Sequence, residues 1–406
     1  MTSGDLSARK IARTALLLRF AAAIGIYFFT PWGSLAPDED TYHQRGGFLA
    51  QYWRGEIPVS PLSGTSEPAG YYYIVAALYY PFGPLPILPK LFNAWLGSLV
   101  VLEFFRLTRL VSGSESAALR ATKFVAFFPS MILWSSLMVR DVWVQWLLAR
   151  LAREMAELKG RFIPTKIIYA GFLIWGLTQF RSYLLYAAVG PLILSFVLSR
   201  SKDVFRNLVL GSFFLLGLSY FEAQNSAAGK VTNLDLAEVQ RLRSWSSSEA
   251  AANSGFGRDA DVSTVGGALS FLPTGLTYFF FAPFPWQATS LSKAMAVPET
   301  MYFYTLVPGI LGGIVYLFRH RLADAVGVLL MTMTVTFGYA IGQGNVGTLY
   351  RHKAQVIGFY YAFAAIGIES RKRRPTAPAR YSPYAPPRIP ARIGGAADAW
   401  AARRDT

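Results

Sequence analysis

Three consecutive acidic residues, Asp38, Glu39 and Asp40, stand close to His43 in a polar segment that follows the first apolar run. Adjacent carboxylates repel one another, so three of them in a row indicate a structural or functional role for the group. It can bind a divalent cation through its oxygens, or one acid can act as a general base because its neighbours raise its pKa. The alternative is a solvated loop that ends a helix. We take the segment as a candidate site, with Asp38 and Glu39 as catalytic residues and Asp40 and His43 as binding residues.

A fourth acid, Asp141, follows Arg140 at the start of a later apolar segment. The positive end of a helix dipole stabilises an acid at a helix start, which is one sufficient explanation for it. Ionisable residues near membrane depth are also functional candidates by default, so Asp141 is predicted to be catalytic. With Asp38 and His43 it is predicted to hold a divalent cation, Mg²⁺, Mn²⁺ or Zn²⁺. A histidine at a helix end without a metal is the alternative for His43.

Four basic residues at the same predicted level are candidates for substrate binding: Arg181, Arg351, His352 and Lys353. Arg181 separates two apolar runs, and the other three precede the last one. A guanidinium offers two parallel donors, a geometry that suits the phosphate of a lipid-linked substrate. The alternative for Arg351 and Lys353 is that their charged ends reach out to lipid headgroups. Glu67 is a further acidic candidate for substrate binding.

The composition indicates which kind of fold must position these residues. Of 406 residues, 53% are apolar and 15% are charged, with a mean hydropathy of +0.32. Ordinary soluble domains contain about 25% charged residues. Apolar runs long enough to cross a hydrocarbon core of about 30 Å recur along the chain, so we expect an all-α polytopic membrane protein. Basic cytoplasmic connections explain much of the net charge of +16, and no nucleic-acid partner is predicted.

Hydropathy and the alternation of basic connections predict ten membrane-spanning helices. They cover residues 11–30, 88–111, 117–137, 141–158, 165–180, 182–199, 205–221, 300–318, 323–342 and 354–369. This count places both termini in the cytoplasm of a bacterial inner membrane. Two further apolar segments, 71–81 and 269–286, are predicted to lie in the outer interface as short or broken helices. The outer face then carries two polar loops, 31–70 and 222–268.

Residues 1–370 are expected to form one transmembrane domain, and residues 371–406 a disordered, basic, proline-rich cytoplasmic tail that contacts anionic lipid. The first apolar run has no small-residue cleavage site, so it is predicted to be a retained helix. The absence of cysteine excludes disulfides and thiolate metal sites. The GxGxxG, P-loop, GxSxG and HExxH motifs are also absent, so nucleotide hydrolysis, serine hydrolase and zincin chemistry have no support.

The order of these motifs resembles the GT-C superfamily of membrane glycosyltransferases, in particular bacterial members akin to protein mannosyltransferases and aminoarabinose transferases. In that family an Asp-Glu pair stands four and three residues before a Tyr in the first outer loop, as Asp38 and Glu39 stand before Tyr42. In the family this pair is followed by an acid before proline and then by a short aromatic helix. Segment 67–73 of this chain resembles that pattern. Segment 128–141 resembles the family's Leu- and Phe-rich helix that ends in an outer acid.

The resemblance implies a GT-C-like fold and an inverting transfer of a sugar from a polyprenyl-phosphate donor to a hydroxyl of a glycan or glycolipid acceptor. The acceptor would be part of cell-surface polysaccharide or glycolipid assembly, and Asp38 would take its proton. Some members have a lysine after the loop acid, which is replaced here by Pro68. Phosphate binding would therefore fall to Arg181, Arg351 or Lys353.

Two other functions stay open. A polysaccharide polymerase or ligase uses an oligosaccharide on a pyrophosphate carrier, and it would depend on outer arginines and tolerate the loss of Asp38. A flippase or transporter of lipid-linked sugars would place polar groups at mid-membrane, where Gln145 and Gln179 are among the few candidates. The sequence shows no internal repeat, which weakens the transporter interpretation.

Overall fold

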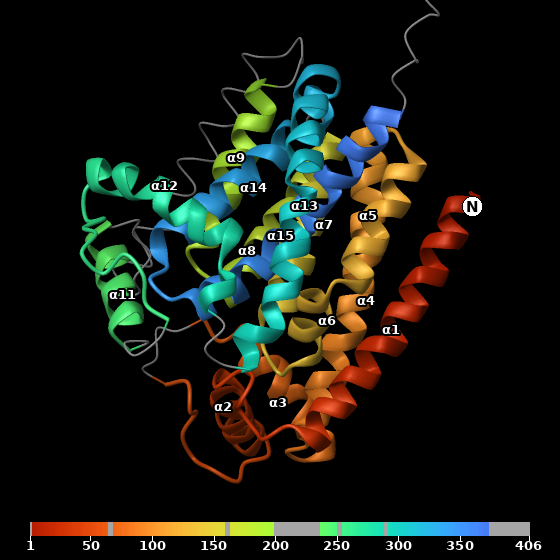
Figure 1. Cartoon of the computed structure of the whole chain (residues 1–406). Coiled ribbons are helices and arrows are strands. Elements are labelled where there is room, and N and C mark those ends of the chain that lie inside the picture. Colours follow the sequence, from red (N-terminus) through yellow and green to blue (C-terminus); the bar gives the residue numbers. More distant parts are fainter. Residues whose placement is uncertain are drawn as a thin grey trace, which may run out of the picture. The chain divides into compact units, whose positions relative to one another are not determined.

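The computed structural model describes residues 2–63, 68–158, 163–198, 236–249, 254–287 and 291–372, and these residues fold into helices joined by short connections (Figure 1). The α-helices are α1 (Ser3–Phe29), α2 (Asp38–Trp53), α3 (Gly70–Phe82), α4 (Ile87–Ser112), α5 (Glu115–Phe127), α6 (Pro129–Ser136), α7 (Asp141–Leu158), α8 (Pro164–Phe180), α9 (Leu184–Leu198), α11 (Leu236–Glu249), α12 (Val265–Phe281), α13 (Leu291–His320), α14 (Leu322–Gly342) and α15 (Val346–Lys372). A 3-10 turn, η1 (Pro285–Gln287), precedes α13. The expected all-α fold is confirmed for these residues.

Four of the described helices are long and apolar enough to cross a membrane: Ser3–Phe29, Ile87–Ser112, Ala296–His320 and Leu322–Gly342. They correspond to four of the predicted spans, and the described chain is that of a helical membrane protein. Helices α7, α8, α9 and α15 coincide with further predicted spans but lie outside this group. The predicted span 205–221 lies outside the described residues. The total of ten crossings stays a prediction.

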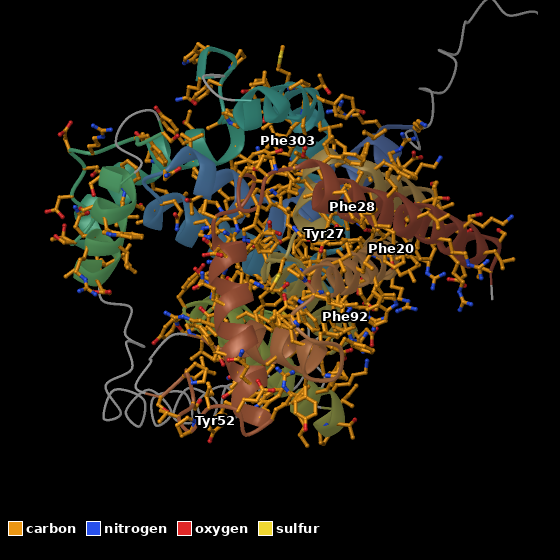
Figure 2. The ribbon with its side chains drawn as sticks, turned by 90° about the horizontal axis from the view of Figure 1, so that it is seen from below. Phe20, Tyr27, Phe28, Tyr52, Phe92 and Phe303 are labelled. Atoms are coloured by element: carbon orange, nitrogen blue, oxygen red, sulfur yellow. The ribbon has the colours of Figure 1, made fainter. Side chains whose placement is uncertain are left out.

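Helix α1 shows how a membrane-spanning helix divides its surface. Ala8, Ala12, Ala15 and Ala23 are buried, which gives the neighbouring helices a narrow face of small side chains. On the opposite side Phe28, labelled in Figure 2, is 69% exposed. In a protein that crosses a membrane, an exposed apolar side chain finds a suitable environment in lipid.

Helix α4 contacts α1, α5, α6 and α7 and so lies at the centre of the first half of the fold (Figure 1). Val100 and Val101 are fully buried in it. Gly97 permits a close approach to α6, because a Cβ atom there would lie 2.6 Å from Cβ of Ser135. The short segment α2–α3 lies at the end of these helices where α1 finishes (Figure 1).

The predicted span 117–137 is wrong as a single helix, because the structure divides it into α5 and α6. The reason is Pro129, which has no N–H to donate and disfavours a helical conformation of the residue before it. Phe128 accordingly has an extended backbone, with φ −67° and ψ 134°. A second interruption follows at residues 137–140, so that Asp141 is the first residue of α7.

The interruption leaves carbonyl groups at the end of α5 without hydrogen-bond donors from the helix. The guanidinium of Arg19 on α1 donates to them instead. Its Nη1 donates to the carbonyl of Ala126 at 2.9 Å and its Nη2 to that of Val125 at 3.0 Å. Its Nε donates to Oγ of Ser135 at 3.0 Å. Arg19 is fully buried, so its charge is distributed over the negative end of a helix rather than paired with an acid.

The predicted tail 371–406 begins at the end of α15. Residues up to Arg371 form one compact unit by their contacts, and the limit of the transmembrane domain at residue 370 stays a prediction. Apart from its first two residues, the predicted tail lies outside the described residues, so its disorder stays a prediction.

We predict that Arg19→Met destabilises the protein, because two buried carbonyls lose a charged donor, each such hydrogen bond contributing about 1.5–3 kcal/mol. Thermal unfolding of the purified protein in detergent measures this as a lower Tm. Arg13→Met, on the exposed side of α1, is the control and leaves the Tm unchanged. Equal Tm values for the two variants would contradict this role of Arg19.

Candidate functional site

The three adjacent acids are the first turn of α2, not a solvated loop. The positive end of the helix dipole stabilises negative charge at this position, which explains why three carboxylates can be adjacent. Successive residues of a helix point in directions about 100° apart, so the three side chains separate. The side chain of Glu39 is 3% exposed, that of Asp38 is 48% exposed, and Asp40 is on the surface.

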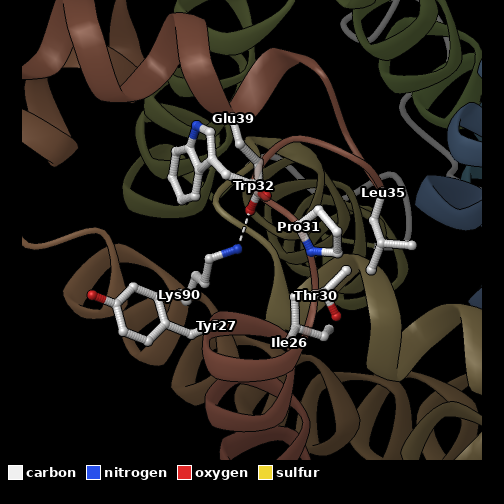
Figure 3. Close-up of a pocket in the computed structure, with 8 residues that line it drawn as sticks. All are labelled: Ile26, Tyr27, Thr30, Pro31, Trp32, Leu35, Glu39 and Lys90. Carbon is white, nitrogen blue, oxygen red and sulfur yellow. Dashed lines mark hydrogen bonds and ion pairs between the residues drawn. The ribbon is translucent and has the colours of Figure 1, made fainter.

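Glu39 points into the protein and forms a buried ion pair with Lys90 of α4, drawn in Figure 3. It also accepts a hydrogen bond of 2.7 Å from the backbone N–H of Met138, between α6 and α7. The pair borders a small cavity of about 100 Å³ that Tyr27 and Trp32 help to line (Figure 3). Glu39 thus links α2, α4 and the α6–α7 connection, and its predicted role in catalysis stays a prediction.

Arg351 of α15 joins the two other predicted catalytic acids. Its Nη1 donates to Oδ2 of Asp38 at 2.7 Å. Its Nε and Nη2 both lie 2.7 Å from Oδ2 of Asp141. The guanidinium also lies 5.7 Å from the centre of the Trp134 ring, which covers one side of it. Residues from three distant parts of the chain therefore meet at one cation.

Asp141 is fully buried, so its charge requires several partners. Besides Arg351, Nη2 of Arg181 lies 3.5 Å from its Oδ1. The side-chain amide of Gln355, one turn further along α15, donates to the same oxygen. Gln355 is oriented in turn by the hydroxyl of Tyr339 on α14, at 2.5 Å. The carboxylate thus connects α7, α15, α14 and the α8–α9 junction.

A third arginine, Arg140, was not among the predicted binding residues. Its Nη1 donates to the carbonyl of Phe180 at 2.8 Å, directly before Arg181. Its Nε is buried and has no hydrogen-bond partner within the described residues. The position of Arg140 next to Asp141 in the sequence was the signal that could have identified it. We call the five residues Asp38, Arg140, Asp141, Arg181 and Arg351 the arginine–aspartate cluster.

The arginine–aspartate cluster contains three arginines against two aspartates. An arginine stays protonated at any physiological pH, so the cluster carries one more positive than negative charge when both acids are ionised. An excess of buried or half-buried positive charge favours an anionic ligand, and guanidinium groups suit phosphate oxygens in particular.

The two residues that follow Arg351 on α15, His352 and Lys353, point away from Asp38 and Asp141. The ring of His352 stacks on Tyr339, with ring centres 4.8 Å apart, and it is buried. Lys353 donates to the carbonyl of Phe280 at 2.8 Å, and its ammonium lies 4.5 Å from the centre of the Phe303 ring. Neither contacts the two aspartates directly. Their predicted roles in substrate binding stay predictions.

His43 and Asp40 also lie apart from Asp141. Nδ1 of His43 is 2.9 Å from the hydroxyl of Tyr79, and Asp40 accepts a hydrogen bond of 2.7 Å from Gln44. Burial lowers the pKa of His43, although the charge of Asp40 acts in the opposite direction.

In the part of the chain that the structure describes, no three His, Cys, Asp or Glu side chains lie close enough together to bind a metal ion. The guanidinium of Arg351 lies between Asp38 and Asp141, where the predicted cation would have to bridge them. The cation with Asp38, Asp141 and His43 as ligands stays a prediction. Glu67 lies outside the described residues.

Comparison with known proteins identifies no family for this chain. None of the protein-family models matches its sequence, and no curated protein is significantly similar to it. The GT-C resemblance consequently depends on the short sequence motifs alone and stays a prediction.

We predict different stability effects for the two aspartates that share Arg351. Asp141→Asn leaves buried arginine charge unpaired, which costs about 3–5 kcal/mol. Asp38→Asn breaks a pair that is half exposed and costs less than about 1 kcal/mol. Thermal unfolding of both variants gives the order of their Tm values. A lower Tm for the Asp38 variant would contradict the buried placement of Asp141.

Proposed function

We propose that the protein is a membrane glycosyltransferase that moves a sugar from a polyprenyl-phosphate donor to a hydroxyl of a glycan or glycolipid acceptor. The observation that carries this proposal is the half-exposed carboxylate of Asp38 held beside Arg351, in a cluster with an excess of positive charge. The carboxylate can accept a proton, and the arginines can bind a phosphate. The order of motifs that resembles the GT-C superfamily supports the same activity.

The reaction follows from these two properties. The acceptor hydroxyl attacks the anomeric carbon and gives its proton to Asp38, while the bond between that carbon and the phosphate oxygen breaks. The leaving phosphate gains negative charge, and preorganised cations stabilise it most in the transition state. Arg351 and Arg181 are assigned to this phosphate. Arg351 contacts Asp38 through Oδ2, so Oδ1 is assigned to the acceptor hydroxyl.

Asp141 is assigned a positioning role. It is buried behind the two arginines and makes no contact with solvent. Its ion pairs fix the direction of Arg351 and Arg181, so both guanidinium groups are in place before a substrate arrives.

The lipid part of the donor needs an exposed apolar surface. Helix α12 exposes Val265 and Leu269, at 67% and 61%. The carbonyl of Phe280 near its other end accepts the hydrogen bond of Lys353, which attaches α12 to the helix that carries Arg351. We assign the polyprenyl chain to the exposed face of α12.

The proposed topology has ten crossings and both termini in the cytoplasm of a bacterial inner membrane. It places the arginine–aspartate cluster at the outer face, where polysaccharide precursors meet their acceptors. The described helices support this order, since α1 ends before the cluster and α7 and α15 begin at it.

A second candidate is a polysaccharide polymerase or ligase that uses a pyrophosphate-linked donor. The specific observation in its favour is the third arginine, Arg140, because a pyrophosphate carries more negative charge than a phosphodiester. This candidate does not require Asp38 as a base.

We predict that Asp38→Asn lowers the turnover of polyprenyl-phosphate sugars in proteoliposomes by about 10²–10⁴-fold, the usual contribution of a general base. Asp259→Asn, an exposed change of the same kind in the outer polar segment, is the control and keeps wild-type turnover. Full turnover by the Asp38 variant would remove the base assignment and favour the polymerase or ligase.

We predict that Arg140→Gln raises the KM for a polyprenyl-phosphate sugar by about tenfold, the loss of one charge-assisted interaction, with little change in kcat. A pyrophosphate-linked donor measured in parallel distinguishes the two candidates, since the true donor is the one turned over by the wild type. An unchanged KM would show that Arg140 does not contribute to the anion site.

A further inference from the structure

A second polar cavity lies apart from the arginine–aspartate cluster. Its volume is about 550 Å³, and it is lined by Arg106, Arg109, Leu110, Arg153, Glu157 and Arg321. Four arginines thus face one glutamate and one apolar side chain. The proposed sugar transfer uses none of these residues.

The cavity lies at the opposite end of the helices that carry the candidate site. Lys90 and Arg106 both belong to α4, and a helical rise of 1.5 Å per residue separates them by about 24 Å. Asp141 and Arg153 belong to α7 and are about 18 Å apart by the same measure. The two sites are therefore on different sides of the helical bundle.

The cavity is at the level where apolar helices end. Arg106 and Arg109 are near the end of the candidate span Ile87–Ser112. Arg321 is the residue between two other candidate spans, Ala296–His320 and Leu322–Gly342. Three helices that can cross a membrane thus end at its wall. In a bilayer this is the level of the lipid headgroups.

The arginines are held in position by acids behind the wall. Glu103 binds Nη1 of Arg106 at 2.9 Å, and Asp5 binds Nη1 of Arg109 at 2.8 Å. Each guanidinium has five N–H donors, so one ion pair leaves donors for a ligand. The side chains of Arg106 and Arg109 are 44% and 37% exposed, which makes them accessible from outside.

Arg321 adds a separate observation. Its Nη2 lies 2.8 Å from Oδ2 of Asp324 and donates to the carbonyl of Leu110 at 3.3 Å. Its Nε is buried and has no hydrogen-bond partner within the described residues. A buried donor without a protein partner is costly, and a water molecule or a bound anion would satisfy it.

We propose that this cavity binds the phosphate of an anionic phospholipid headgroup, as a lipid site on the membrane face opposite to the arginine–aspartate cluster. The arginines bind the phosphate oxygens through charge-assisted hydrogen bonds, and Leu110 contacts the apolar part of the same lipid. Inorganic phosphate shares the anion but not the apolar part or the location at the headgroup level.

The test measures lipid binding to the purified full chain by native mass spectrometry, with phosphatidylglycerol and, separately, phosphatidylcholine as probes. Arg106→Gln with Arg109→Gln lowers the affinity for phosphatidylglycerol by about tenfold or more. The matched control removes two positive charges elsewhere, with Arg54→Gln and Arg241→Gln, and keeps the wild-type affinity. Phosphatidylcholine, which has no net charge, binds all forms weakly and equally.

A second variant, Leu110→Trp, fills the cavity without changing its charge, and it is expected to weaken phosphatidylglycerol binding as well. If the double arginine variant fails to fold, the Leu110→Trp variant tests whether the lipid binds in this cavity. Equal phosphatidylglycerol affinity in all variants would overturn the proposal. Inorganic phosphate binding that depends on Arg106 and Arg109, without such lipid binding, would also overturn it and assign the cavity to a free anion.

Discussion

The burial of one carboxylate governs the arrangement of the described helices. Asp141 has no exposed surface, so its negative charge must be balanced inside the protein by Arg351 and Arg181. Since these partners come from α15 and from the α8–α9 junction, the charge balance requires helices distant in the sequence to meet. Arg351 also reaches the more exposed Asp38, which ties α2 to the same point. The grouping of residues that we propose for catalysis is therefore also a condition of the fold.

Buried charge has a second role where helices are interrupted. Pro129 prevents one continuous helix, and the freed backbone groups need partners in an apolar environment. Arg19 binds the carbonyls at the end of α5, and Glu39 binds the N–H of Met138 beyond α6. Asn93 of α4 donates to the neighbouring carbonyls of residues 137 and 139. These side chains hold the irregular connection that places Asp141 at the start of α7.

Sequence reasoning succeeded where the hydrophobic pattern was long. The limits of α4 and α14, two of the helices that are long and apolar enough to cross a membrane, agree with predicted spans within a few residues. The limits of α7 and α8 also match predicted segments, but their crossing of the membrane stays a prediction. The alternation of basic connections placed Asp38, Asp141, Arg181 and Arg351 on one face, and the structure brings them together. The hydrophobic pattern did not show which of the three acidic side chains points into the protein. In the first turn of α2, which begins at Asp38, the side chain of Glu39 is the buried one.

The partners of several polar side chains could not be predicted, because they are set by tertiary contacts between residues far apart in the sequence. Lys90 lies within a predicted span, and nothing around it indicated Glu39 as its partner. His43 and Lys353 are near the cluster in the sequence, yet helical rotation turns them toward Tyr79 and Phe280. The interruption at Pro129 was the exception, because the proline itself was a visible signal.

Asp141 and Arg351, far apart in the sequence, form an ion pair around a fully buried carboxylate, and the geometry of the site depends on it. A double-mutant cycle of Asp141→Asn and Arg351→Gln measures it through the free energies of unfolding of both single variants and the double variant. We expect a coupling energy of about 2 kcal/mol, with the double variant less destabilised than the sum of the single changes. Additive effects, with a coupling energy near zero, would contradict it.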